Sequence, residues 1–212
     1  MVLLTVLVGT LFLIPLTAAI ADQGFYLGAS GGQAKLDKDD VDRVFEVSTW
    51  PANGIEGSFD FTGTVMKVYG GYHFNRNLAF EAAYEKMDGF EINARFTDGS
   101  GSAKVELEAT TTLLTGVGAF PFDSGITLFA KLGMARTTSK ATCTCTGTGT
   151  MSNCSNDVGG SEKEWDPAYG LGVSYDFTKN IAARIEWERI KDSGDRDNIG
   201  LDLTTLGVQY NF

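Results

Sequence analysis

The sequence predicts an all-β protein: an eight-stranded, antiparallel, up-and-down transmembrane β-barrel. Three observations predict this fold. Apolar residues alternate with small or polar residues along most of the chain, which is the period of a strand with one apolar face. The connections between these stretches alternate between short and long, as at the two rims of an antiparallel barrel. The last stretch alternates up to Phe212, so we expect a final strand sealed into a closed sheet.

The clearest alternation lies in the C-terminal part of the chain. In residues 169–177 the odd positions are apolar and the even positions are small or polar. Residues 181–187 repeat the pattern after a short Thr-Lys-Asn turn, and residues 206–212 show it again. The period is two and not the 3.6 of a helix, so each stretch is interpreted as a strand.

Five further strands are predicted upstream, at residues 25–32, 62–74, 78–85, 108–120 and 126–136. The fourth of these is the least decisive, because Thr-Thr-Thr-Leu-Leu at 110–114 does not alternate. Short turns are expected at 75–77, 121–125 and 178–180, and longer polar loops at 35–61, 86–105, 137–163 and 190–199. We expect the short turns to face the periplasm and the four loops to face the exterior.

Physical reasons favour closure of the sheet. Strands of ~10 residues can cross the hydrocarbon layer when tilted. An open edge in lipid would leave backbone groups unpaired, at a cost of roughly several kcal/mol each. A barrel of about eight strands has an interior filled by side chains, so no wide channel is expected.

The N-terminal residues predict a signal peptide. Residues 1–21 contain no charged side chain, and their apolar core, interrupted by Pro15, ends in Ala19-Ile20-Ala21. Cleavage is expected between Ala21 and Asp22. A transmembrane helix is the alternative, and the lack of lysine or arginine departs from the usual signal peptide. The expected organisation is a signal peptide at 1–21 and a barrel domain at 22–212, in the outer membrane of a Gram-negative bacterium.

Composition limits the other function classes. The 212 residues carry a formal net charge of −10, which argues against a nucleic-acid partner. The 26 glycines and the aromatic content of 11% suit many close strands and membrane-interface rings. A soluble all-β domain is the alternative class.

Six charged residues fall on the inward side of the predicted strands. We expect them to form an ion-paired network in the lumen, because unpaired charges in a narrow interior are costly. Glu81 and Arg184 each lie four residues beyond a turn asparagine, so at ~3.3 Å per residue they reach a similar height and are candidates to bridge the lumen. The six are Lys67, Glu81, Glu85, Lys131, Arg184 and Glu186.

No catalytic, cofactor or metal site is predicted. The single histidine, His73, lies two residues before a short turn, and Ser174 and Asp176 lie near the same rim. We therefore interpret His73 as a lumen or rim residue and expect no enzymatic activity. The acidic run in the first long loop lacks the glycine and terminal glutamate of a calcium-binding loop; it comprises Asp37, Asp39, Asp40 and Asp42.

Three cysteines, Cys143, Cys145 and Cys154, lie in the predicted loop at 137–163. An oxidising exterior favours a loop disulfide. Cys154 could pair with either partner, whereas a bridge from Cys143 to Cys145 would close a small ring. A metal site is the weaker alternative, because three thiols without a nearby histidine lack a fourth ligand.

The chain resembles the small outer-membrane β-barrels such as the transmembrane domain of outer-membrane protein A (OmpA). The resemblance covers residues 24–212 and is sharpest in VYGGYHFNRNLAFEAAYEKMDG, YGLGVSYDFTKNIAARIEW and the terminal LGVQYNF. It implies aromatic residues at the membrane interfaces, for which the candidates are Tyr72, Tyr84, Tyr175, Trp187, Tyr210 and Phe212. From this resemblance we expect the chain to lack the peptidoglycan-binding domain of longer family members.

The resemblance also implies a function. We expect a monomeric integral barrel with a structural, envelope-integrity and surface-display role, in contact with outer-membrane lipid and lipopolysaccharide. The barrel-assembly machinery is expected to recognise the strand ending in Phe212.

Family members carry a salt-bridge gate of four charged positions in the lumen. Glu81 and Arg184 match two of these positions, whereas Val117 and Ser174 stand at the other two. Lys131 and Glu186 are candidates to substitute for the two missing charges. A narrow pore and a loop-mediated adhesin or host-factor binder remain open as alternatives.

Overall fold

The computed structural model describes residues 23–37, 55–99, 101–147, 165–191 and 200–212. The predicted signal peptide lies outside these ranges. The described residues form nine strand segments: β1 (Gly24–Leu36), β2 (Ile55–Asp60), β3 (Thr62–Asn75), β4 (Leu78–Phe96), β5 (Gly101–Pro121), β6 (Ile126–Gly147), β7 (Asp166–Asp176), β8 (Ile181–Ile190) and β9 (Leu201–Asn211). Within these ranges no helix is long and apolar enough to span a membrane.

The sheet closes into an eight-membered ring. Going round it, the order is β3, β1, β9, β8, β7, β6, β5 and β4, and β4 pairs again with β3. All of these pairings are antiparallel, and β1 joins β9, so the first and last strands meet. β2 adds no ninth position, because it is separated from β3 by Phe61 alone and pairs with the same neighbour, β4. The predicted eight-stranded antiparallel barrel is confirmed.

Three of the long loops were predicted wrongly where they adjoin the barrel, because strands continue into them. The expected loop at 86–105 consists mostly of strand, because β4 continues to Phe96 and β5 starts at Gly101. The loop expected at 137–163 starts inside β6, which runs to Gly147, and the one at 35–61 contains β2. Polar residues on both faces of these stretches resemble a loop in sequence, yet strands outside lipid need no apolar face. Gly89 contributed to the error, since its φ of 96° belongs to a bulge between Met87 and Phe90 and not to a loop.

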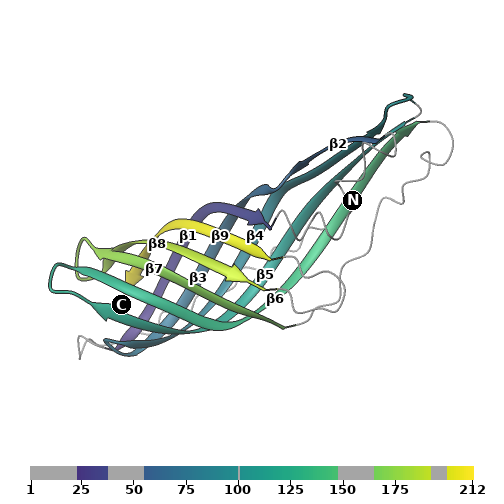
Figure 1. Ribbon diagram of the computed structural model, residues 1–212. Coiled ribbons are helices and arrows are strands. Elements are labelled where there is room, and N and C mark those ends of the chain that lie inside the picture. The colour runs from purple at the N-terminus through teal and green to yellow at the C-terminus, as the bar shows by residue number, and fades with distance from the viewer. Residues whose placement is uncertain (1–22, 38–54, 100, 148–164, 192–199) are drawn as a thin grey trace, which may run out of the picture.

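These extra residues build a sheet that extends well beyond one end of the barrel (Figure 1). We call it the flap, and it consists of β2 together with residues 90–96 of β4, 101–109 of β5 and 137–147 of β6. The short connections 76–77, 122–125 and 177–180 lie at the opposite end of the barrel. The predicted asymmetry of the two rims is therefore present.

The barrel is apolar outside and charged inside. Leu132 and Leu206 are 71% and 64% exposed, whereas Lys67 and Glu85 are 2% and 0% exposed. The exposed apolar side chains on β6 run from Ile126 to Met134. At ~3.3 Å per residue and a tilt of about 40° these eight residue steps span roughly 20 Å, comparable with the ~25 Å apolar band of outer-membrane barrels. A face of this kind requires lipid and not water as its surroundings.

Candidate functional site

All six charged residues that were predicted to point inward lie together in the lumen. Each is 5% exposed or less. Lys67 comes from β3, Glu81 and Glu85 from β4, and Lys131 from β6. Arg184 and Glu186 come from β8. Because side chains alternate between the two faces of a strand, these odd positions of β3, β4 and β6 and even positions of β8 all project into the barrel.

The pair predicted to bridge the lumen does so. Arg184 donates from Nη1 to Glu81 Oε2 at 2.8 Å. β4 and β8 are separated by three strands in either direction round the ring, so this contact crosses the full width of the lumen. Lys131 donates to Glu81 Oε1 at 2.6 Å, and Tyr26 donates its hydroxyl to Glu81 Oε2 at 2.9 Å. Glu81 therefore has three donors.

Glu186 is the second hub of the cluster. Its carboxylate lies 2.6 Å from Lys67 Nζ, 2.8 Å from Lys131 Nζ and 3.0 Å from Arg184 Nη2. Lys131 and Glu186 thus contact the Glu81–Arg184 pair at the same time. Val117 is buried and Ser174 is half-buried, and neither brings a charge to the cluster.

A seventh charged residue, Glu188, was missed from the sequence. It is 3% exposed, lies 3.1 Å from Lys131 Nζ and also contacts Lys67 Nζ. The predicted strand ended at Trp187 and the polar loop was expected from residue 190, so residue 188 was assigned to neither. Continuing the same alternation by one residue places Glu188 inward beside Glu186. We refer to these seven side chains as the lumen cluster.

Aromatic rings enclose the guanidinium group of Arg184. Its Cζ lies 4.6 Å from the ring centroid of Tyr69 and 4.3 Å from that of Phe129. The lysine ammonium groups of the cluster lie about 6 Å from these rings. The Tyr69 ring packs on Gly28 of β1, where an added Cβ would meet Tyr69 Cζ at 2.2 Å. Cation–π contacts and this close packing leave little space around the charges.

His73 lies on the opposite side of the barrel from Ser174 and Asp176 and contacts an aromatic ring. Its ring contacts that of Tyr26, with the centroids 4.6 Å apart. Ser174 and Asp176 belong to β7, on the opposite side of the ring from β3. The contact that the structure gives the His73 ring is therefore with another aromatic ring.

The comparisons with known proteins agree with this construction. Residues 4–212 match the family model for the outer membrane protein beta-barrel domain. The chain belongs to this family. It is 27% identical over 151 residues to outer membrane protein A of Klebsiella pneumoniae, and 28% identical over 149 residues to that of Serratia marcescens. These matches cover 68% and 67% of the chain but only 40% and 37% of the relatives, so the chain spans about 40% of their length.

Solved barrels share the fold. The N-terminal β-barrel domain of OprF from Pseudomonas aeruginosa superposes with a TM-score of 0.55 at 13% identity, covering 90% of this chain and 99% of that one. Neisserial surface protein A gives a TM-score of 0.54 at 15% identity, covering 89% and 97%. The resemblance to OmpA-like barrels is confirmed, and the chain is an outer-membrane β-barrel protein.

The candidate interface aromatics of this outer-membrane barrel fall into two rows. Tyr72, Tyr175, Tyr210 and Phe212 lie near the end with the short turns, where Tyr210 and Phe212 pack edge to face at 5.0 Å. Tyr84 and Trp187 lie six residues along their strands from Leu78 and Ile181, or ~20 Å. Lys86 and Arg189 follow them on the same outward side. The rows lie at different heights of the barrel wall, and their role as interface girdles stays a prediction.

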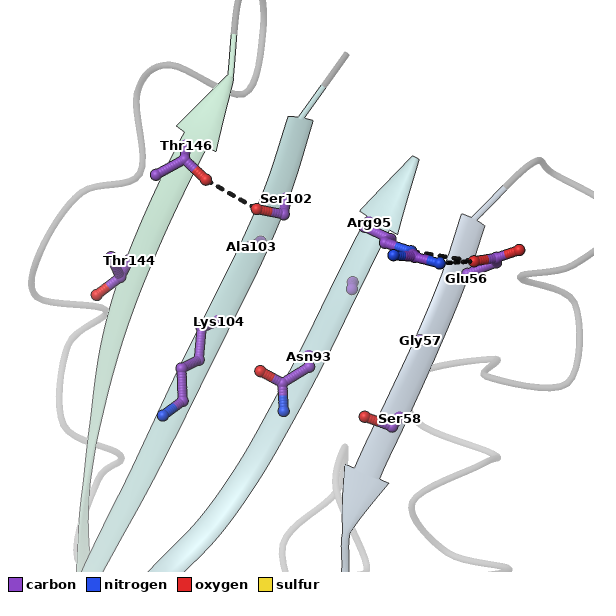
Figure 2. Close-up of a pocket in the computed structure, with 11 residues that line it drawn as sticks. Glu56, Gly57, Ser58, Asn93, Arg95, Ser102, Ala103, Lys104, Thr144 and Thr146 are labelled. Atoms are coloured by element: carbon purple, nitrogen blue, oxygen red, sulfur yellow. Dashed lines mark hydrogen bonds and ion pairs between the residues drawn. The ribbon is translucent and has the colours of Figure 1, made fainter. Parts of the chain in front are cut away.

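The outward face of the flap carries a shallow polar groove (Figure 2). Arg95 of β4 pairs with Glu56 of β2 at 2.6 Å, and Ser102 and Thr146 share a hydrogen bond of 2.8 Å. Lys104 lies 2.8 Å from Glu106 and 3.1 Å from Glu91. The hydrogen bonds that the Lys104 ammonium group donates to Glu106 and Glu91 raise the pKa of Lys104, which keeps it charged. The groove therefore presents both signs of charge and hydroxyl groups to water.

Two of the three cysteines lie in a strand and not in a loop. Cys143 and Cys145 belong to β6, where they share one face because they are two residues apart. Cys145 is disulfide-bonded, whereas Cys143 is a thiol whose Sγ lies 3.8 Å from Cys145 Sγ. Cys154 lies outside the described residues.

Thiol counting tests this assignment. We expect one reactive thiol per chain in denatured, unreduced protein and three after reduction, since the chain has three cysteines. A thiol reagent with an absorbance readout under denaturing conditions gives the number. Three thiols before reduction would contradict the disulfide.

Proposed function

We propose that this outer-membrane barrel has a non-enzymatic, structural role in envelope integrity, that the lumen cluster plugs its interior, and that it displays the flap on the cell surface. The observation that carries the proposal is the buried Glu81–Arg184 contact across the lumen. A pore would need hydrated space at this level. Instead, seven charged side chains and the rings of Tyr69 and Phe129 meet there.

The proposed partners follow from the surface. The apolar band and its two aromatic rows suit outer-membrane lipid and lipopolysaccharide. β9 ends one residue before Phe212, whose side chain is 68% exposed on the lipid side. We propose that the barrel-assembly machinery recognises this strand, and that the assembled protein is a monomer because the band is continuous around a closed ring.

A second candidate function, binding of a surface ligand or host factor, is favoured by the groove on the flap. Its charged and hydroxyl side chains lie along one face of the flap (Figure 2), and the flap extends beyond the end of the barrel (Figure 1). A binding role would depend on these side chains, whereas a structural role would not.

Complementation separates the two functions. A strain lacking the gene receives the wild-type chain or a variant with Glu56→Ser, Arg95→Ser and Lys104→Ser, all exposed residues of the groove. Envelope integrity is measured as resistance to detergent and to a bulky antibiotic. We expect both chains to restore resistance equally. Restoration by the wild type alone would favour the binding role, and unchanged resistance in the deletion strain would contradict the structural role.

The proposed orientation makes a separate prediction. Asp98 lies in the turn between β4 and β5 at the flap tip, and Lys179 lies in a short turn at the other end. In a Cys143→Ser background, Asp98→Cys is expected to react with a membrane-impermeant maleimide on intact cells, and Lys179→Cys only after lysis. The reverse pattern would invert the orientation. Arg76, in another short turn, provides a second inner position.

A further inference from the structure

The lumen cluster contains one more acid than base. Its bases are Lys67, Lys131 and Arg184, and its acids are Glu81, Glu85, Glu186 and Glu188. All seven are buried, with exposures of 5% or less. An uncompensated charge in such a place is so costly that a carboxyl group takes up a proton instead. The cluster therefore needs one further positive charge or one bound proton.

Contacts identify which acid lacks compensation. Glu81 and Glu186 each contact at least two cations at 3.0 Å or less. Glu188 contacts Lys67 and Lys131. Among the residues that the structure describes, Glu85 has one cation within ion-pair distance, Lys67, with 3.2 Å between Lys67 Nζ and Glu85 Oε1.

Lys67 is itself already engaged. Its ammonium group donates hydrogen bonds to Glu186 and Glu188. Among the described residues, neither carboxyl oxygen of Glu85 has a hydrogen-bond partner, although its side chain is 0% exposed. A buried carboxylate with two unsatisfied oxygens would forfeit its hydration without replacement.

We propose that Glu85 binds the neutralising proton, so that the lumen cluster holds a neutral carboxylic acid beside its three ion-paired glutamates. The charged groups that face it are Lys67 of β3 and, across the lumen, Glu186 and Glu188 of β8. Loss of the proton adds an unbalanced negative charge next to two others. This proton site deepens the proposed plug and rests on the same cluster, but its tests measure protonation and stability, while the plug is tested by conductance.

The pH dependence of stability follows from this proton. An unfolded glutamate releases its proton near its ordinary pKa of about 4.3, whereas the folded chain retains it. The folded state therefore binds more protons, and stability falls as the pH rises above that value until Glu85 ionises. Glutamine in place of Glu85 is neutral at every pH and removes this contribution.

Glu85→Gln tests the proposal, with Glu186→Gln as the matched control. The readout is the urea midpoint of the detergent-folded barrel between about pH 6 and 9. We expect the midpoint of Glu85→Gln to equal or exceed that of the wild type at neutral pH and to lose the alkaline decline. Glu186→Gln is expected to lower the midpoint at every pH, because it leaves three cations without their shared carboxylate. A lower midpoint in Glu85→Gln with an unchanged pH slope would overturn the proposal.

Infrared spectroscopy observes the proton directly. The folded wild type at neutral pH is expected to show the carbonyl stretch of a protonated carboxylic acid, and Glu85→Gln is expected to lack it. A band that persists in Glu85→Gln but disappears in Glu188→Gln would reassign the proton and overturn the proposal. Absence of the band, together with a urea midpoint that rises with sodium concentration at constant ionic strength, would show that a metal cation and not a proton neutralises the cluster, and would overturn the proposal.

Discussion

Glu81→Ala is expected to lower the free energy of unfolding by about 3–5 kcal/mol, the cost of removing one partner from a buried ion pair. The variant deprives Arg184 Nη1, Lys131 Nζ and the Tyr26 hydroxyl of their shared acceptor. Arg184 then keeps Glu186 and Gln209, which cannot replace a bond across the lumen. Urea unfolding in detergent micelles, followed by gel migration with and without boiling, gives the change in midpoint.

A matched exposed glutamate controls for the loss of charge as such. Glu108→Ala, on the water-exposed part of β5, is expected to change the free energy of unfolding by no more than about 0.5 kcal/mol. An unchanged midpoint in Glu81→Ala would show that the lumen cluster does not brace the barrel.

Gly133→Ala is expected to be among the most damaging single-methyl substitutions in the barrel wall. An added Cβ would lie 2.0 Å from the carbonyl oxygen of Leu114 and 2.7 Å from Thr115 Cα, both backbone atoms of the paired strand β5. Since neither atom can rotate away, β5 and β6 must separate, at a cost of about 1–3 kcal/mol or more. The measurement is the urea midpoint together with the fraction of protein that refolds into the heat-modifiable form.

Gly118→Ala provides the matched comparison, because a Cβ there meets nothing within 4 Å. It is expected to refold and unfold like the wild type. Equal midpoints for the two variants would contradict the close approach of β5 and β6 at Gly133.

The alternation of apolar and polar residues with a period of two was sufficient to predict most of the fold. In a barrel the lipid face must be apolar and the lumen need not be, so alternation alone placed Lys67, Glu81 and Arg184 inward. The same rule would have found Glu188, had the alternation in β8 been followed past Trp187. Height above the turns was sufficient to predict that Glu81 and Arg184 meet, because both positions are counted from the same rim.

Other features could not be derived from alternation. Which cations share Glu186 depends on the stagger of β3, β6 and β8, which is set by closure of the whole ring and not by any one strand. The flap was missed because residues 90–96 and 101–109 pair in water, where neither face has to be apolar. Loops were predicted there because an apolar face was required of every strand, although this requirement holds only for strands in contact with lipid.

The most direct test of the plugged lumen is a planar-bilayer recording of the wild-type protein. With Arg184 bridging to Glu81 across the ring and Lys131 beside them, we expect at most very small conductance steps. Variants that remove the bridge, such as Glu81→Ala, are expected to conduct more often than the wild type. Large, steady channels from wild-type protein would contradict the account.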